Sequence, residues 1–166
     1  MNSTPDTSSP SDGMVRDDEQ IIAFAARLST ERGQVFTPIR QHVLKTLLES
    51  SCPLTAYDVL ERLGGIGANN PPTAYRALDF LEDLGLIRKI TSLRKYVVLR
   101  SGPTLGPIVF SICEACGKVR EIEDSASLLT LAAQAKLSGF VTRHITVELR
   151  GICEADILAA QSRDQT

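Results

Sequence analysis

The sequence predicts an α+β protein, in which a small C-terminal α/β domain follows an N-terminal winged helix-turn-helix domain. Three observations indicate this class. Apolar residues recur at helical spacing in four successive segments, and two short strand-like runs follow them, as in a winged helix-turn-helix. Residues 101–107 contain two prolines and two glycines, which is typical of a linker. Beyond this linker, strand-like runs flank a Cys-x-x-Cys turn.

Length and composition allow one large or two small domains, since the chain has 166 residues and 43% of them are apolar. No run approaches the roughly 18 consecutive apolar residues of a membrane span. The N-terminus lacks the pattern of a secretory signal. We therefore expect a cytoplasmic protein without a membrane partner, in which paired thiols bind metal more often than they form disulfides. Residues 1–17 are rich in Ser, Thr, Pro and Asp and are predicted to form a disordered tail.

The winged-helix domain is expected over residues 18–100. Thr37 is predicted to cap the second helix, with Pro38 at its first position, and Thr55 to start the third. A glycine pair is predicted to end the third helix, and Gly85 the fourth. The expected helices are 19–32, from Pro38 onward, 55–63 and 71–84, and the expected strands are 86–90 and 96–99.

Residues 101–107 are the expected hinge, and residues 108–166 the expected α/β domain. Strands are predicted over 108–112, 118–122 and 140–149, a helix over 127–137, and a short last helix around Ile157 and Leu158. Alternation in the last strand predicts one face with Ile145, Val147 and Leu149, and another with His144, Thr146 and Glu148.

The fourth helix has the two faces that a DNA-reading helix needs. Thr73, Tyr75 and Arg76 lie at its N-terminal end, where such helices meet base edges. Arg can bridge guanine O6 and N7, and Tyr or Thr can contact a thymine methyl group or a phosphate. The face predicted to pack on the scaffold comprises Ala74, Ala77, Leu78, Leu81 and Leu84.

The two strands after this helix carry local positive charge, although the net charge of the chain is −2. From Arg88 to Arg100 there are five basic residues and no acidic one. Arg94 and Lys95 lie at the predicted hairpin turn, where they would neutralise DNA phosphates as the wing of the domain. The alternative is that these cations only keep an exposed strand edge soluble.

Two turns with the same spacing predict a zinc site. Cys113-Glu-Ala-Cys116 lets two thiolates bind one ion, and Cys153-Glu-Ala-Asp156 has a carboxylate in the last position. Zinc prefers four such ligands in a tetrahedron, and an ion shared by two distant turns stabilises a small domain. We expect about one structural Zn²⁺ per subunit, on Cys113, Cys116, Cys153 and Asp156. Zinc on the three cysteines plus water or another donor, and metal-free thiols that are reduced or oxidised, stay open as alternatives.

A second metal site has few candidate ligands, because the chain has only two histidines. His144 and Glu148 share a face of the predicted strand, and they would need a further ligand such as Glu121 or Asp124. The alternative is that His144 and Glu148 are ordinary polar residues of a strand.

Several segments together have the character of a family signature. They are Thr37-Pro-Ile-Arg40, Leu54-Thr-Ala-Tyr-Asp-Val-Leu60, Pro71-Pro-Thr-Ala-Tyr-Arg-Ala-Leu-Asp-Phe-Leu81, Cys113-Glu-Ala-Cys-Gly-Lys-Val-Arg-Glu121, and Gly139-Phe-Val-Thr-Arg-His144 to Gly151-Ile-Cys153. Over roughly residues 20–156 the chain resembles the ferric uptake regulator family, and most of all its zinc uptake branch. The resemblance implies a homodimeric, metal-dependent transcriptional repressor that binds AT-rich, near-palindromic operator DNA through its winged-helix domain and dimerises through its C-terminal domain. By position, it implies that Tyr75 and Arg76 read bases, that Tyr57 contacts the DNA backbone, and that Cys113, Cys116 and Cys153 hold the structural zinc.

The chain departs from this family at the positions that bind metal. Asp156 stands where the family has a fourth structural cysteine, and a histidine-rich stretch is replaced by residues 107–112. At the sensing site of the zinc branch, Arg88 replaces a histidine and Leu99 replaces a cysteine, and a further histidine is missing near Leu105. Arginine and leucine cannot ligate zinc.

Altered or absent zinc sensing is therefore expected. Glu121, the glutamate of the sensing site, is kept, and Glu121 and His144 are the candidate remnants of a second site. Arg88 could take the place of the positive charge of a bound ion and hold the wing ready for DNA.

The cysteines also suggest two other functions. A regulator of the same fold could respond to oxidants through its three thiols. A Cys-x-x-Cys thiol oxidoreductase is a third interpretation, but its motif should open a helix, whereas Gly117 and a strand-like run follow here. The sequence has no Ser/His/Asp set, phosphate-binding glycine loop or paired catalytic carboxylates, so we predict that the protein is not an enzyme.

Overall fold

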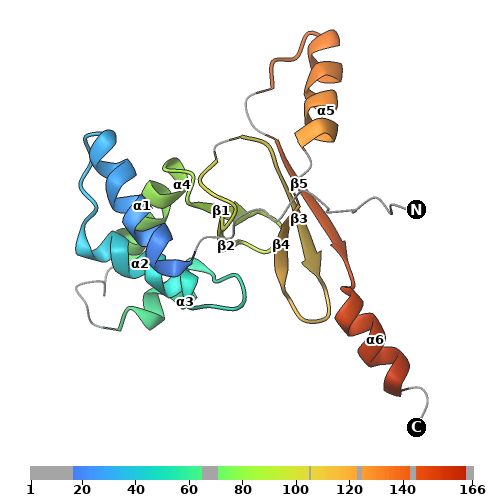
Figure 1. Cartoon of the computed structure of the whole chain (residues 1–166), viewed down its shortest axis with the longest axis horizontal. Coiled ribbons are helices and arrows are strands. Elements are labelled where there is room, and N and C mark those ends of the chain that lie inside the picture. Colours follow the sequence, from blue (N-terminus) through green and yellow to red (C-terminus); the bar gives the residue numbers. More distant parts are fainter. Residues whose placement is uncertain (1–16, 65–70, 105, 123–124, 143–144, 164–166) are drawn as a thin grey trace, which may run out of the picture.

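The computed structural model describes residues 17–64, 71–104, 106–122, 125–142 and 145–163 (Figure 1). Its helices are α1 (Asp18–Glu31), α2 (Pro38–Leu48), α3 (Ala56–Arg62), α4 (Pro71–Asp83), α5 (Ser125–Leu137) and α6 (Glu154–Arg163). Its strands are β1 (Ile87–Ile90), β2 (Lys95–Val98), β3 (Ile108–Cys113), β4 (Val119–Ile122) and β5 (Thr146–Gly151). The predicted α+β class and order of elements are confirmed. The tail predicted over residues 1–17 lies outside the described residues, except for Asp17.

Local capping explains where the N-terminal helices begin. The Asp17 side chain accepts a hydrogen bond from the Gln20 N–H at 2.7 Å, and Gln20 accepts one from the Asp17 N–H in return. Thr55 and Asp58 form the same capping box at the start of α3. Thr37 precedes α2 as predicted, but its hydroxyl makes no capping hydrogen bond, so the fixed φ of Pro38 is the stronger start signal there.

Helices α1–α4 and the β1–β2 hairpin form the winged-helix unit, which has one apolar core. Fully buried members of this core include Val43, Leu44, Val59, Leu78 and Leu81. Strands β1 and β2 pair antiparallel, from Ile87 opposite Val98 to Ile90 opposite Lys95. Residues 91–94 form the turn of this wing, and Arg94 adopts a positive φ of 54° there. None of the described helices has the length and apolar character that crossing a bilayer requires.

The C-terminal unit, β3 to α6, is built on a three-stranded sheet in the order β4–β3–β5. Strand β3 is antiparallel to β4 and parallel to β5. Figure 1 shows α5 and α6 extending from opposite ends of this sheet.

The strand predicted over 140–149 was placed wrongly. Strand β5 begins at Thr146 and continues to Gly151. Its parallel partner β3 starts at Ile108, which pairs with Thr146, so the described residues 140–142 have no paired residue in β3. Phe140 instead closes the end of α5, because its N–H donates to the Ala135 carbonyl at 3.0 Å.

A second apolar cluster joins the two units. The wing contributes Ile90 and Leu99 to it, and the sheet contributes Ile108, Phe110 and Ile112. Phe110 and Ile90 are fully buried, and Leu99 is 2% exposed. Figure 1 shows the hairpin lying between the helices of the winged-helix unit and the C-terminal sheet.

Candidate functional site

The C-terminal ends of β3 and β5 bring the two predicted metal-binding turns together. The strands are parallel, and the last pair in their register is Cys113 with Gly151, two residues before Cys153. Backbone hydrogen bonds from the Cys113 N–H to Lys118 (2.9 Å) and from the Gly117 N–H to Cys113 (3.0 Å) close the first turn. Gly117 has a φ of 71° there, a conformation that favours glycine.

Four potential ligand atoms converge at this end of the sheet. The Sγ atoms of Cys113, Cys116 and Cys153 and a carboxylate oxygen of Asp156 all lie within 4.8 Å of one another. The Cys116 and Cys153 sulfurs are 3.9 Å apart, close to the ~3.8 Å edge of a tetrahedron with 2.3 Å zinc–sulfur bonds.

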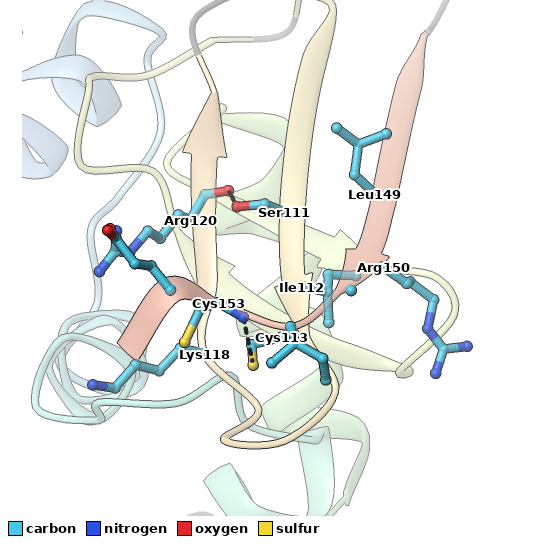
Figure 2. Close-up of a pocket in the computed structure, with 11 residues that line it drawn as sticks. Ser111, Ile112, Cys113, Lys118, Arg120, Leu149, Arg150 and Cys153 are labelled. Atoms are coloured by element: carbon cyan, nitrogen blue, oxygen red, sulfur yellow. Dashed lines mark hydrogen bonds between the residues drawn. The ribbon is translucent and has the colours of Figure 1, made fainter. Parts of the chain in front are cut away.

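Asp156 completes the cluster from the first turn of α6. Its Oδ2 lies 3.0 Å from the Cys113 sulfur and 2.9 Å from the Cys153 sulfur. The Cys153 N–H also donates to the Cys113 sulfur at 3.3 Å (Figure 2). Three thiols and one carboxylate at these distances fit a structural, four-coordinate zinc ion.

Metal binding at this cluster competes with protons. Hydrogen bonds from the thiols of Cys116, Cys153 and Cys113 lower the pKa of Asp156 to about 2. The hydrogen bond to this carboxylate raises the pKa of the Cys116 thiol to about 12. By contrast, the Cys116 backbone N–H lowers the pKa of Cys113. A zinc ion has to displace thiol protons, so its affinity falls as the pH falls.

An open pocket of about 320 Å³ adjoins the cluster (Figure 2). Ser111, Arg120 and Leu149, which are neighbours across the three strands, line its upper part. They belong to the face of the sheet opposite Phe110, so the pocket lies away from the winged-helix unit.

The predicted DNA-contacting residues are accessible on the winged-helix unit. On α4, Tyr75 (49% exposed) and Arg76 lie on the surface and Thr73 is half-buried, whereas Ala74, Ala77, Leu78 and Leu81 are buried. Tyr57 on α3 is 77% exposed. At the wing, Arg94 is exposed and Lys95 is half-buried.

The positions expected to have lost a sensing site are occupied by other contacts. Leu99 is packed in the cluster that joins the two units. The Arg88 guanidinium donates to the Thr104 carbonyl at 2.8 Å, and its buried Nε has no hydrogen-bond partner among the described residues. Glu121 accepts hydrogen bonds from the Arg100 N–H at 2.8 Å and from the Ser101 hydroxyl.

The proposed partnership of His144 with Glu148 stays a prediction, because His144 lies outside the described residues, as do Leu105 and Asp124. Glu148 instead accepts hydrogen bonds from the N–H groups of Thr91 and Ser92 in the wing turn. No sequence pattern predicts this contact, because any residue except proline can supply a backbone N–H.

Comparison with known proteins agrees, over most of the chain, with the family resemblance seen in the sequence. The model of the Ferric uptake regulator family matches residues 31–150. The Zinc uptake regulation protein of Escherichia coli (strain K12) is 36% identical over 145 residues, which is 82% of this chain and 81% of that protein.

Solved structures agree with this match. The crystal structure of holo XcZur is 33% identical, with a TM-score of 0.78 over 85% of this chain and 99% of that one. A zinc uptake regulator complexed with zinc and DNA is 31% identical, with a TM-score of 0.81 over 88% of this chain and 99% of that one. The likeness covers both the winged-helix unit and the C-terminal sheet, and it confirms the resemblance seen in the sequence. The chain therefore belongs to the Ferric uptake regulator family.

Proposed function

We propose that this protein is a dimeric transcriptional repressor that binds operator DNA and contains one structural zinc ion per subunit. Members of its family are regulators, and the protein is not an enzyme. The observation that carries the proposal is the likeness, at a TM-score of 0.81 and 31% identity, to a relative complexed with zinc and DNA. We also propose the predicted division of the chain into a tail (1–17), a DNA-binding domain (18–100), a hinge (101–107) and a dimerisation domain (108–166).

DNA binding is assigned to α4 and the wing. Tyr75 and Arg76 would read base edges from the exposed N-terminal end of α4, with Thr73 beside them. Tyr57 and the wing residues Arg94 and Lys95 would contact the phosphate backbone. The opposite face of α4 is buried, which supports this assignment because only the side chains on the exposed face can contact DNA.

The zinc ion would be held by Cys113, Cys116, Cys153 and Asp156. When bound, zinc supplies a crosslink between the turn after β3 and the first turn of α6, which stabilises the C-terminal unit. The chain's own residues prepare the site, because the parallel pairing of β3 and β5 holds the two turns together.

Dimerisation is supported by the distribution of exposed apolar side chains. Of the thirteen exposed large hydrophobic residues in the described part of the chain, ten lie in the C-terminal unit. They are Ile122, Leu129, Leu131, Leu137, Phe140, Val141, Leu149, Ile152, Ile157 and Leu158. Apolar surface of this extent is typical of a protein–protein interface.

We further propose that zinc sensing at a second site is lost. Two observations support this: Leu99 is packed in an apolar cluster, and the Glu121 carboxylate already accepts two hydrogen bonds. Arg88, with its fixed positive charge, disfavours a cation beside it. Operator binding should therefore not require zinc beyond the structural ion.

Metal analysis combined with DNA binding tests these proposals. The operator would be selected from random duplexes with the wild-type protein, and its affinity measured with and without added zinc and a mild chelator. We expect about one zinc per subunit and an affinity that added zinc does not change. Two zinc ions per subunit, or binding that needs added zinc, would contradict the loss of sensing, and failure to select any duplex would contradict DNA binding.

One observation favours a second candidate function, a redox-responsive regulator of the same fold. The Cys116 and Cys153 sulfurs are 3.9 Å apart, so a small shift would let them form a disulfide. Peroxide would then oxidise the two thiols and be reduced to water, with release of zinc. Operator binding that survives peroxide treatment unchanged would exclude this function.

A further inference from the structure

One row of three residues on the C-terminal sheet lies at its contact with the winged-helix unit. Glu121, Phe110 and Glu148 are direct neighbours across β4, β3 and β5, so their side chains point to the same face of the sheet. Phe110 is fully buried in the apolar cluster with Ile90 and Leu99 of the wing. The Glu121–Phe110–Glu148 row thus places a carboxylate on either side of the apolar contact.

Glu148 holds the wing turn by its backbone. Its Oε1 accepts a hydrogen bond from the Thr91 N–H at 2.8 Å, and its Oε2 accepts one from the Ser92 N–H at 3.3 Å. Each carboxylate oxygen accepts from one of two consecutive N–H groups. The carboxylate therefore fixes the orientation of the wing turn as well as its distance from β5. Hydrogen bonds to an ionised acceptor are roughly twice as strong as those between neutral groups.

Glu121 holds the other end of the same contact. It accepts from the Arg100 N–H at 2.8 Å and from the Ser101 hydroxyl, at the point where the wing passes into the hinge. Arg100 also reaches back to α1 and α2, with its guanidinium 2.8 Å from Asp18 and 3.1 Å from the Leu48 carbonyl. The two carboxylates therefore hold both ends of the hairpin that leads from α4 to the sheet.

We propose that the Glu121–Phe110–Glu148 row keeps the winged-helix unit in its DNA-binding orientation without a second metal ion, and that Glu148 is the positioning residue for the wing. This proposal rests on the proposed function, and it names the residues that take the place of a sensing ion. A bridging ion joins two units through ligands from each. Here two carboxylates of the sheet join them through N–H and hydroxyl donors of the wing and hinge.

Hydrogen exchange of the zinc-loaded, full-length protein tests the contact directly and needs no DNA. Glu148→Gln keeps the size of the side chain but replaces one acceptor oxygen with an NH₂ group, which cannot accept from an N–H. We expect exchange of the Thr91 and Ser92 amides to accelerate on the order of tenfold or more, while the amides of α2 and α4 keep their rates. Glu19→Gln, at an exposed glutamate in the first turn of α1, is the matched control for loss of one charge and should leave these amides unchanged.

Operator affinity then tests the role of Glu148 in positioning the wing. Loss of its charge and loss of its contact are expected to change the affinity in opposite directions. Removing a negative charge near a DNA-binding surface strengthens DNA binding by electrostatics alone. Loss of the positioning contact instead weakens it, and we expect Glu148→Gln to bind the selected operator about tenfold more weakly than wild type, at unchanged zinc content. Glu19→Gln should bind equally well or slightly more tightly.

The outcomes separate this proposal from the proposed function. Unchanged exchange at Thr91 and Ser92 in Glu148→Gln overturns the contact itself. Faster exchange with unchanged operator affinity overturns the positioning role. A wild-type protein that selects no DNA, or that needs a second zinc, overturns the proposed function and with it the positioning role, whereas the contact between Glu148 and the wing is still decided by exchange.

Discussion

Replacing Leu99 with Ala should reveal whether this position serves packing rather than metal binding. Leu99 is 2% exposed and lies in the cluster with Ile90, Ile108, Phe110 and Ile112. Truncating a buried leucine to alanine costs roughly 2–5 kcal/mol, depending on how far the cavity collapses. This cluster is small, and a cavity in a small cluster is partly filled by its neighbours, so we expect a loss of about 2–3 kcal/mol in the free energy of unfolding.

Urea denaturation of the zinc-loaded protein measures this loss. The subunit concentration has to be fixed, because the stability of a dimer depends on it. Val35→Ala, at a side chain that is 71% exposed, is the control and should cost less than about 0.5 kcal/mol. A loss below about 1 kcal/mol for Leu99→Ala would refute the reasoning, since a filled apolar contact cannot be truncated at so small a cost.

Three further predictions concern the metal, the DNA and the pH. Asp156→Ala should weaken zinc binding by at least the roughly 10–100-fold that loss of a supporting partner costs, and Asp156→Cys should strengthen it, as measured by competition with a chromophoric chelator. Arg76→Ala should weaken operator binding by about 1–3 kcal/mol and relax the base preference at one position. Arg94→Ala should weaken binding to all duplexes alike and lower by about one the slope of log affinity against log salt concentration. Salt titrations of binding measure both effects. The hydrogen bond from the Thr55 hydroxyl lowers the pKa of Asp58 from 3.8, so this capping box stabilises the fold above that pH. This stabilisation is lost as the pH falls through the lowered pKa. Acid titration of Asp58→Asn should therefore lack this part of the pH dependence of unfolding.

Each of these has an outcome that would contradict it. Equal zinc affinity in Asp156→Ala and wild type would favour three cysteines with water as the fourth ligand. Equal losses on all duplexes for Arg76→Ala would assign that side chain to phosphate rather than to bases. An unchanged acid transition in Asp58→Asn would mean that the capping box persists in the unfolded chain.

The sequence predicted the winged-helix unit well because its elements carry their own start and stop signals. Thr55 with Asp58 starts α3, Pro71 starts α4, and Gly85 follows its end with a φ of 74°. The start of β5 carries no such signal, since it depends on where β3 begins to offer a partner.

The candidate site was predictable in part, for a related reason. Cysteine spacing identified the zinc ligands as candidates, but their convergence depends on the parallel pairing of β3 with β5, which spacing does not encode. The contacts of Glu121 and Glu148 were not predictable. Their N–H donors lie 21 and 57 residues away in the chain, and a backbone donor leaves no mark in the sequence.

An ion can regulate this protein only if it binds one arrangement of the two units more tightly than another. All four proposed zinc ligands belong to the C-terminal unit, so the ion has no ligand in the winged-helix unit through which to favour one orientation. The contacts that join the units come instead from the Glu121–Phe110–Glu148 row and from the apolar cluster around Phe110. Partial removal of the structural zinc by a strong chelator should therefore speed hydrogen exchange around Cys113 and α6 before it affects Thr91 and Ser92. Simultaneous loss of protection at both places would show that the structural ion does control the wing, and that the two units are coupled through the sheet itself.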